Sequence, residues 1–319
     1  MDEDGAKQVI HLSIITPTYN EEDSILECIA RLRQVMQDTL PEFSYEHLII
    51  DNSSTDSTAS IAIGESKKDP RVKVIVNSRN IGASRSIYRA LGRVQGVWTI
   101  PMLPADLQDP VEVIPLMLDS AKDEVEIVYG VRTNRQENIL IRSLRKIYYR
   151  LLRKASTFDL QNDAGEFVLI SARVRQAILE VKDENPYVRG LIAQTNAKSR
   201  FIPYVWKKRD NGKSKSSPLV LVDVAISGIV STTHVPARIA LLFGFVMSAL
   251  GVTAGVVYFL LSFTSEGTST SGIPTIIISI FFLGGVQLFF LGLIGEYVLS
   301  IHRQIKPEPT VTSVQESNL

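Results

Sequence analysis

Two long stretches without a charged side chain constrain this sequence more than any other feature. Residues 239–263 carry no charge over 25 positions, and residues 273–295 carry none over 23. At about 1.5 Å per helical residue, either stretch can cross a hydrocarbon layer of about 30 Å. A buried helix of a soluble core is the alternative, but such helices usually carry charges on one face. The sequence therefore predicts two membrane-spanning helices, bounded at 236–263 and 273–299.

Lys and Arg residues flank both apolar stretches but are missing between them. They occur in residues 198–215 before the first stretch and in 296–306 after the second, whereas residues 264–272 contain neither. Because positively charged segments stay in the cytoplasm, both termini are predicted to be cytoplasmic and the short loop external. The single cysteine, Cys28, excludes an intramolecular disulfide and fits a reducing compartment.

Apolar, β-branched runs alternate with helical patterns in the N-terminal part. The runs occupy residues 9–16, 46–51, 72–77, 97–103 and 125–131, and helical patterns begin at residues 23, 56 and 82. This alternation predicts an α/β domain over residues 9–205, with a largely parallel sheet and helices on both faces. In such sheets ligands bind beyond the carboxyl ends of the strands, where the site residues are therefore expected.

The segments outside this domain differ in composition. Residues 1–8 form a polar N-terminus that we expect to be flexible, and because no apolar run precedes the first predicted strand, a cleaved signal peptide is not expected. Residues 206–235 predict a basic loop and an interfacial juxtamembrane helix, because a third span would break the charge pattern. Residues 300–319 form a tail, which from Lys306 onward is polar and predicted to be disordered.

Unusual residues follow the first three apolar runs. The first run ends in TPTYNEED with Pro17, Tyr19 and Glu21, the second ends at Asp51, and Gly82 follows the third. Asp51 at a strand tip can accept hydrogen bonds from a nucleoside, and Gly82 permits close backbone approach. Helix capping is the alternative for the Ser, Thr and Asp residues after Asp51.

Seven blocks, read in order, resemble the family 2 polyprenyl-phosphate glycosyltransferases. They are PTYNEE, IDNSSTDS, NIGASRSIYRALGRVQG, ADLQDP, NDAGEFVLISARV, YVRGL and RDNGKSK. This group includes dolichyl-phosphate mannose synthases, bactoprenyl-phosphate glucosyltransferases and undecaprenyl-phosphate aminoarabinose transferases. The resemblance covers nearly the whole chain and implies a GT-A fold, which is a Rossmann-like nucleotide-sugar-binding domain, followed by two transmembrane helices.

The resemblance implies inverting transfer of a sugar from a UDP- or GDP-linked donor to a polyprenyl phosphate. The acceptor would be undecaprenyl or dolichyl phosphate at the cytoplasmic face of a bacterial inner membrane or its equivalent, and the product would serve cell-envelope or glycoconjugate synthesis. Pro17, Tyr19, Glu21, Asp51 and Gly82 would bind the nucleotide. Asp106 and Gln108 would contact Mg²⁺ or Mn²⁺ on the diphosphate, and Asp163 would lie near the reacting carbon.

The block ADLQDP departs from the family pattern at its start. A divalent cation stabilises the negative charge that develops on a diphosphate leaving group. If residues 106–108 are extended, Asp106 and Gln108 point to the same side and can reach one ion. Pro104 stands where the family usually has a first acid, and it offers neither a side-chain oxygen nor an N–H.

Two other functions therefore stay open. One is a non-catalytic homologue that binds lipid or nucleotide as a scaffold, which Pro104 alone supports. The other is a processive polysaccharide synthase, which is disfavoured because QTNAK at 194–198 lacks the expected Gln-any-any-Arg-Trp block.

Cations are concentrated in residues 131–156, which contain eight Lys or Arg and one acid. The apolar residues of 139–156 follow helical spacing and predict a helix in the membrane interface, with an ordinary amphipathic surface helix as the alternative. A nucleic-acid partner is not expected, because the spans confine the domain to lipid. The resemblance implies that Arg132 and Arg135, which follow the fifth run, are ligands of the acceptor phosphate. Arg209, Ser214 and Lys215 lie in the Gly-containing segment RDNGKSK, which is predicted to close over the diphosphate.

The acceptor itself limits what the enzyme must supply. A phosphate monoester carries about −1.5 to −2 charges at neutral pH, so it attacks without a strong base. Asp163 is accordingly predicted to act by positioning or electrostatics, and a turn before Gly165 is its alternative. Arg189 can support the site or pair with Glu184. The sugar, the base and any homo-oligomer are left open.

Overall fold

The computed structural model describes residues 9–133, 164–181, 183, 186–206, 242–247, 249–251, 253, 273–305 and 312–319. These described residues fall into two compact units. The first unit contains the residues up to 206 together with the C-terminal residues 312–319, and the second contains the apolar helical residues between 242 and 305.

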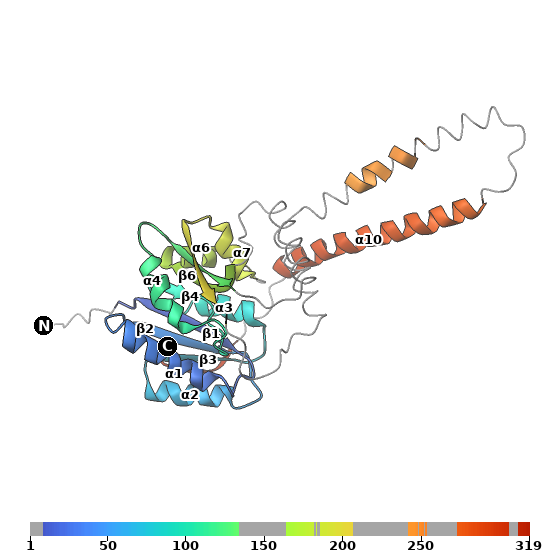
Figure 1. Cartoon of the computed structure of the whole chain (residues 1–319). Helices are drawn as coiled ribbons and strands as arrows, with labels where there is room; N and C mark the ends of the chain where they lie inside the picture. The colour runs from blue at the N-terminus through green and yellow to red at the C-terminus, as the bar shows by residue number, and fades with distance from the viewer. Residues whose placement is uncertain are drawn as a thin grey trace, which may run out of the picture. The chain divides into compact units, whose positions relative to one another are not determined.

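In the described part of the chain, eight strands form one mixed sheet in the order β7-β5-β6-β4-β1-β2-β3-β8 (Figure 1). Their bounds are β1 (Leu12–Thr18), β2 (Tyr45–Asp51), β3 (Val72–Asn77), β4 (Trp98–Ile100), β5 (Ile127–Thr133), β6 (Ala164–Ser171), β7 (Ser199–Val205) and β8 (Ser313–Ser317). Strands β4, β1, β2 and β3 are parallel to one another, and β5 is parallel to β7, whereas β6 and β8 are antiparallel to the strands they pair with. Among the described strands, four pairs are parallel and three are antiparallel, so the prediction of a largely parallel sheet is confirmed in part.

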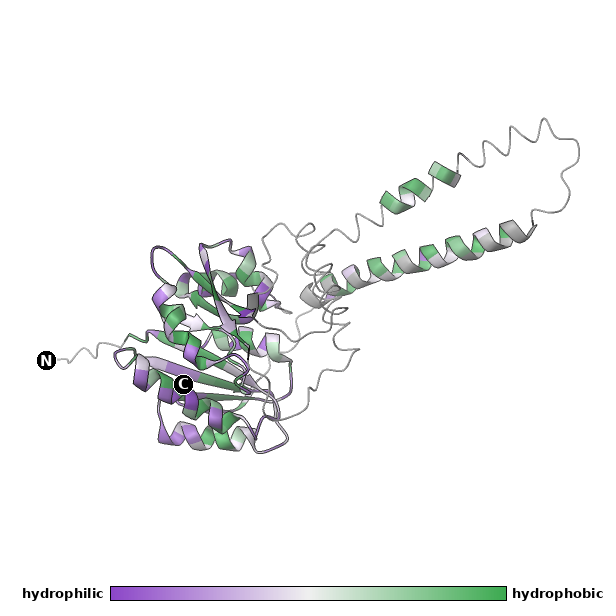
Figure 2. Cartoon of the chain, viewed as in Figure 1, coloured by the Kyte–Doolittle hydropathy of each residue, from purple (hydrophilic) through white to green (hydrophobic). Residues whose placement is uncertain are grey.

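Helices cover both faces of this sheet, as predicted. They are α1 (Ile25–Thr39), α2 (Thr58–Lys68), α3 (Ala83–Leu91), the 3₁₀ helix η1 (Val111–Val113), α4 (Ile114–Ser120), α6 (Ala172–Glu180) and α7 (Val188–Gln194). Because side chains alternate along a strand, Ile14 packs in one core with α1 and α4, and Ile15 in the other with α3, α6 and α7. Figure 2 shows the apolar residues along the strands and the inward sides of the helices.

The five predicted strands are confirmed, with shifts of a few residues at their ends. The fourth is shorter than its apolar run, since β4 ends at Ile100 and residues 101–103 continue outside the strand. The backbone N–H of Leu103 still donates to the carbonyl oxygen of Ile15 at 2.8 Å, so this segment stays against the sheet.

Strands β6, β7 and β8 were not predicted, and β8 corrects the expectation for the tail. Disorder from Lys306 onward is wrong for Ser313–Ser317, which pair antiparallel with β3. An edge strand is held by backbone hydrogen bonds along one side only, and a polar sequence can make those bonds without burying apolar side chains.

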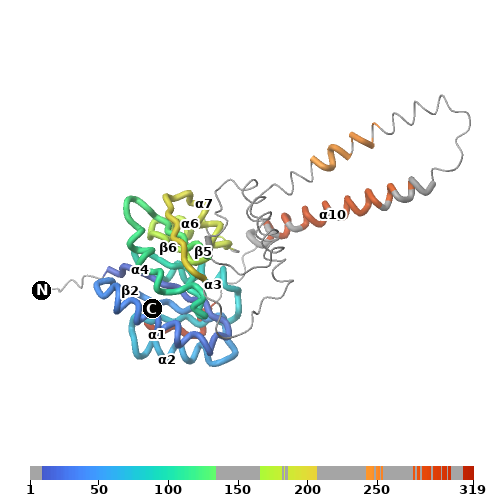
Figure 3. Tube along the Cα trace, in the orientation of Figure 1, coloured from blue at the N-terminus to red at the C-terminus, as the bar shows by residue number. Residues whose placement is uncertain are grey.

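The second unit contains α10 (Ile273–Ile305), a helix of 33 residues (Figure 3). Its segment Phe282–Leu299 has a mean hydropathy of 1.7 and is long and apolar enough to cross a membrane. Leu242–Gly251 is a shorter apolar helix within the predicted first span, most of which lies outside the described residues. One spanning candidate is thus present in the described residues, where the sequence predicted two.

Candidate functional site

The loops that follow β1 and β2 are bound to each other by hydrogen bonds. The N–H of Asn20 donates to Ser54 Oγ at 2.9 Å, and the N–H of Glu21 donates to Thr58 Oγ1 at 2.8 Å. In return, the N–H of Thr55 donates to Asn20 Oδ1 at 2.8 Å. We call residues 18–24 and 51–58 the donor rim. Because each loop donates hydrogen bonds to the other, the two loops together form one polar surface at this edge of the sheet.

Asp51 lies at the base of the donor rim with 0 % exposure. Its Oδ1 accepts from Thr18 Oγ1 at 3.0 Å and from Ser54 Oγ at 2.5 Å, and its Oδ2 accepts from the N–H of Ser54 at 2.8 Å. These bonds shape a turn in which Ser53 has a positive φ of 61°. Asp51 lies at the end of β2, where the sequence predicted it. Its carboxylate accepts hydrogen bonds from Thr18 and Ser54.

The other predicted nucleotide contacts reach the same edge of the sheet. Pro17 lies near the end of β1, Tyr19 is 40 % exposed beside it, and Glu21 follows in the rim. Gly82 begins α3 with a φ of 83°, and a Cβ there would meet no atom within 4 Å. Glycine is therefore favoured at this position by the backbone conformation and not by lack of space.

The segment between β4 and η1, residues 104–109, is a turn. Leu107 has a φ of 53°, its N–H donates to the Pro104 carbonyl at 3.2 Å, and the N–H of Gln108 donates to Asp106 Oδ1 at 3.2 Å. Residues 106–108 are therefore not extended, because an aspartate can bind the N–H two residues ahead and so favours a turn. Strand alternation therefore cannot decide how Asp106 and Gln108 face an ion.

The side-chain oxygens that this turn offers as metal ligands suit one kind of metal. Among the described residues, no group of three or more His, Cys, Asp or Glu side chains could hold an ion by itself. Asp106 and Gln108 offer oxygen ligands from a carboxylate and an amide. Mg²⁺ is commonly held by one or two carboxylates, with water and substrate phosphate completing its shell. The residues present fit a hard divalent cation that arrives with a diphosphate.

Asp109 was not singled out in the sequence, yet it connects this turn to two other strands. It is 1 % exposed, and its two oxygens accept from Arg132 Nε at 3.1 Å and Nη2 at 2.9 Å. The hydroxyl of Tyr204 also donates to Oδ1 of Asp109, and the Arg132 guanidinium lies 5.2 Å from the ring centroid of Trp206. We call Asp109, Arg132 and Tyr204 the loop clamp, since they join the turn to β5 and β7.

The charges of the loop clamp stabilise each other. Burial alone would lower the pKa of the Arg132 guanidinium, but the Asp109 carboxylate beside it raises that pKa above its ordinary value. Burial and the same carboxylate raise the pKa of the Tyr204 phenol. Arg132 therefore stays charged and Tyr204 stays neutral at physiological pH. The Nε and Nη2 nitrogens of Arg132 bind Asp109, so contact with an acceptor phosphate would have to come from Nη1 or from the second N–H of Nη2.

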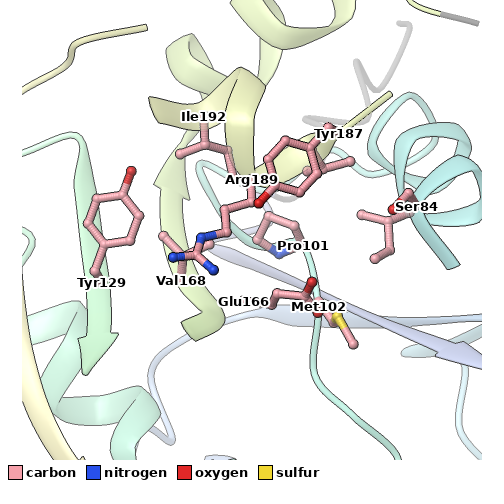
Figure 4. A pocket seen from close by; sticks show the side chains of 11 residues that line it. Ser84, Pro101, Met102, Tyr129, Glu166, Val168, Tyr187, Arg189 and Ile192 are labelled. Carbon is pink, nitrogen blue, oxygen red and sulfur yellow. The ribbon is translucent and has the colours of Figure 1, made fainter. Parts of the chain in front are cut away.

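A pocket opens between α3, the end of β4, β6 and α7 (Figure 4). Ser84, Met102, Glu166, Tyr187 and Arg189 are among its lining residues, and Arg189 reaches between Tyr129 and Glu166 in this view. Burial raises the pKa of Tyr129 to about 12, so its hydroxyl is a neutral hydrogen-bonding group. Arg189, which the sequence left between two roles, lies at the pocket. Glu166 was missed, although it belongs to the NDAGEFVLI block.

Several predicted site residues lie outside the described part of the chain. These are Arg135, Asp163, Arg209, Ser214 and Lys215, together with the basic helix over 139–156. The structure brings Pro17, Tyr19, Glu21, Asp51 and Gly82 to one edge of the sheet, and it sets Asp106 and Gln108 in the turn beyond β4.

Comparison of the sequence with known proteins identifies the family to which the chain belongs. Residues 13–179 match the model described as Glycosyl transferase family 2. The chain is 34 % identical over 301 residues to the glycosyltransferase YkcC of Bacillus subtilis (strain 168), covering 94 % of this chain and 92 % of YkcC. It is 29 % identical over 299 residues to the bactoprenol glucosyl transferase of Shigella phage SfII, covering 93 % and 96 %.

Among solved structures, a similar one is the mannosyltransferase PcManGT of Pyrobaculum calidifontis in complex with GDP-Man and Mn²⁺. Its TM-score is 0.45 at 15 % identity, with 76 % of this chain and 81 % of that chain covered. The family model spans more than half of this chain, and YkcC matches nearly all of it. The resemblance of the seven blocks is confirmed: the chain belongs to glycosyl transferase family 2 and is a glycosyltransferase with the mixed α/β sheet of the GT-A fold.

Proposed function

We propose that this enzyme transfers a sugar from a nucleotide sugar to a polyprenyl phosphate at the cytoplasmic face of a membrane. The observation that carries the proposal is the gathering of the donor rim, Gly82 and the 104–109 turn at one edge of the sheet. The likeness to a bactoprenol glucosyl transferase over 93 % of the chain supports the lipid acceptor.

The donor nucleotide would bind across the rim. Tyr19, which is 40 % exposed, would offer a ring for the base, and Glu21 and Gly82, which follow β1 and β3 at the same edge of the sheet, would lie near the rest of the nucleotide. Asp51 would act mainly by holding the Ser54 turn, since its carboxylate is buried among protein donors. Because Asp51 is 0 % exposed, a direct contact with the nucleoside would require groups around its carboxylate to move.

The diphosphate would lie over the 104–109 turn, where Asp106 and Gln108 would hold Mg²⁺ or Mn²⁺. Such an ion, when bound, offsets the negative charge that develops on the diphosphate as the glycosidic bond breaks. The turn itself is pre-shaped by the bonds at Leu107 and Gln108, and Asp109 keeps its far end against β5 and β7. Pro104 contributes no side-chain oxygen, so we expect a weaker metal dependence than an acid at this position would give.

The transferred sugar would enter the pocket beside Met102, where Arg189, Glu166 and Ser84 supply polar groups. An oxygen of the acceptor phosphate attacks the anomeric carbon from the side opposite the diphosphate. The new C–O bond forms as the bond to the diphosphate breaks, which inverts the anomeric centre and releases the nucleoside diphosphate. With about −1.5 to −2 charges, the acceptor needs no strong base. Asp163 would act near this carbon by electrostatics.

Cations would hold the acceptor phosphate. Arg132 at the carboxyl end of β5 is the described member of the proposed set, and Arg135, Arg209, Ser214 and Lys215 complete it. The basic residues 139–156 would bring the domain to anionic lipid.

The sheet also supports two membrane spans. Residues up to 206 and residues 313–317 pair in one sheet, so they must lie on the same side of any membrane. If α10 crosses the bilayer, the chain has to cross an even number of times. A second crossing would then fall within residues 207–272, which contain the uncharged stretch 239–263. The lack of Lys and Arg in 264–272 supports a cytoplasmic position for both ends.

The test is direct transfer by the purified full chain in detergent. Polyprenyl phosphate, Mg²⁺ or Mn²⁺ and a panel of UDP- and GDP-sugars are supplied, and the lipid product is identified by mass spectrometry. A thermal shift screen first ranks the donors, because a ligand at 100 times its Kd stabilises by about 2.7 kcal/mol. We expect a glycolipid with one donor class. Nucleotide binding without any glycolipid would instead favour the scaffold function that Pro104 keeps open.

A further inference from the structure

The last residues of the chain are fastened along the edge of the sheet next to β3. Their register pairs Val74 with Ser317 and Asn77 with Ser313. Beyond the strand, Asn318 Nδ2 donates to the carbonyl oxygens of Ser66 at 2.6 Å and Val72 at 3.0 Å. At the other end, the N–H of Ser78 donates to the carbonyl of Thr312 at 3.0 Å. Strand β8 is therefore held at both ends as well as along its length.

Arg89 on α3 connects β8 to the end of β3. Its Nη2 donates to Ser313 Oγ at 2.7 Å, and its Nη1 donates to Asn77 Oδ1. Ser313 Oγ in turn donates to Glu316 Oε1 at 2.5 Å. One guanidinium thus binds the last residue of β3 and the first residue of β8.

Asn77 passes this connection on to the donor rim. The Nδ2 group of Asn77, which is buried, donates to Asn52 Oδ1 at 3.1 Å and to Ser86 Oγ at 3.1 Å. Ser86 Oγ also donates to Asn52 Oδ1 at 2.6 Å, and the N–H of Asn52 donates to the Thr18 carbonyl at 2.9 Å. Asn52 directly follows Asp51, so an unbroken series of hydrogen bonds runs from the C-terminal strand to the base of the rim.

The two ends of this series differ in how firmly they are held. Asn52, Asn77 and Ser86 are buried, and a buried polar network whose members are all bonded favours a single arrangement. Strand β8 is mostly exposed, and Val314 on it is 71 % exposed, so little apolar burial opposes its release. The outer end of the series is therefore able to detach, and its release removes one support of the buried network that contacts the rim.

We propose that β8, acting through Arg89, positions the donor rim, so that the enzyme binds its nucleotide sugar at full affinity only when its C-terminal strand is docked on β3. Residues 312–319 follow α10 after six residues in the sequence, so the docked strand is joined covalently to the apolar C-terminal part of the chain. Arg89 is a positioning residue in this scheme. The nature of the donor rests on the proposed function above, but the effect of β8 on the rim does not.

The experiment compares the full chain with one ending at residue 311 and with Arg89→Ala and Ser313→Ala. Two matched controls are Ser313→Thr, which keeps the hydroxyl, and Arg93→Ala, which removes a weaker contact to β8, the ion pair with Glu316 at 3.5 Å, that does not run through Asn77. We expect the first three changes to raise the KM for the nucleotide sugar about fivefold, the effect of losing one net hydrogen bond, with kcat nearly unchanged. Both controls keep the parental KM. A peptide of residues 307–319 added to the shortened chain lowers its KM again.

Hydrogen–deuterium exchange gives a readout that needs no substrate. Residues 51–58 and 77–86 should exchange faster in the shortened chain and in Arg89→Ala than in the full chain or Arg93→Ala. Unchanged exchange and unchanged KM in the shortened chain overturn the proposal. A lower unfolding midpoint with an unchanged KM also overturns it, because β8 would then be only a stabilising edge strand. If the full chain transfers no sugar at all, the proposed function fails, and the exchange data still decide the role of β8.

Discussion

Two parts of the candidate site, the donor rim and the loop clamp, are stabilised by different kinds of interaction. The rim is built from many hydrogen bonds, most of them to backbone N–H groups or hydroxyls, between two loops. The loop clamp depends on one carboxylate, Asp109, which is buried and binds both Arg132 and Tyr204. Losing one of many neutral bonds costs about 1 kcal/mol, whereas removing half of a buried ion pair costs about 3–5 kcal/mol. The site should therefore tolerate change at the rim and not at the clamp.

The largest effect is expected from Asp109→Asn. This change leaves the Arg132 charge without its counterion, and because the Arg132 side chain is only 21 % exposed, water can replace little of the lost interaction. We expect a loss of about 3 kcal/mol in the free energy of unfolding, with transfer activity falling as the 104–109 turn loses its anchor. Denaturant unfolding and turnover in detergent measure the two effects.

The matched control is Asp119→Asn, which makes the same change in an exposed ion pair with Lys122. Surface pairs contribute about 0–1 kcal/mol, so this variant should unfold almost like the parent. Equal unfolding curves for the two variants would show that the clamp is no stronger than a surface pair, and the comparison would fail.

Asp106→Asn separates chemistry from stability within the same turn. If Asp106 holds the metal, its loss should lower kcat by about 100-fold, as for other removed electrostatic stabilisers, while the unfolding midpoint changes little. Pro104→Asp should strengthen the dependence of turnover on Mg²⁺. Unchanged turnover in Asp106→Asn would show that the metal assignment is wrong, whatever Pro104→Asp does.

Lowering the pH should reduce the free energy of unfolding through His47, which lies on β2. Its Nε2 pairs with Thr16 Oγ1 at 2.8 Å, and burial, helped by the charge of Arg33, lowers the pKa of His47 to about 4. The unfolded chain takes up a proton first as the pH falls below about 6.5, so the stability held by neutral His47 is lost between about 6.5 and 4. The expected loss is about 2 kcal/mol at pH 5.

His47→Gln tests this prediction, because a glutamine can bond to Thr16 but does not titrate. Between pH 7.5 and pH 5, the unfolding midpoint of the variant should fall much less than that of the parent. If the unfolding midpoints of parent and variant fall equally, groups other than His47 cause the acid sensitivity.

The smallest effect is expected at the rim itself, from Asn20→Ala. The change removes the Oδ1 acceptor of Thr55 but leaves the other bonds between the two loops. Asn20 also has a φ of 54°, so Asn20→Gly serves as a control that removes the side chain and relieves the backbone. We expect a loss of about 1 kcal/mol for the alanine variant and less for the glycine variant. A loss as large as that of Asp109→Asn would mean that the rim is not redundant.

The same two regions show why some features were predictable and others were not. Asp51 and Gly82 were expected at the site because each ends an apolar run or begins a helix, which are local signals. The pairing of Asp109 with Arg132 joins residues 23 positions apart, and its contact with Tyr204 joins residues 95 apart. Their pairing depends on which strands become neighbours, and no local pattern contains that information.

The turn at Leu107 shows a second limit of local patterns. The sequence left open whether residues 106–108 are extended, whereas in the structure β4 ends at Ile100 and Asp106 Oδ1 accepts from the N–H of Gln108. A side chain that offers the backbone an alternative hydrogen bond can end a strand that hydrophobicity alone would continue.

The amino-acid sequence by itself determined the α/β alternation, the carboxyl-edge placement of the polar loops and the apolar C-terminal helix. These depend on the burial of apolar side chains with a helical or strand period, which is encoded locally. The tertiary structure decided the antiparallel β6 and β8, the loop clamp and the connection from Ser313 through Arg89 to the rim. Those features arise from hydrogen bonds and charges between distant segments, and such bonds form only once the sheet has brought their partners within reach.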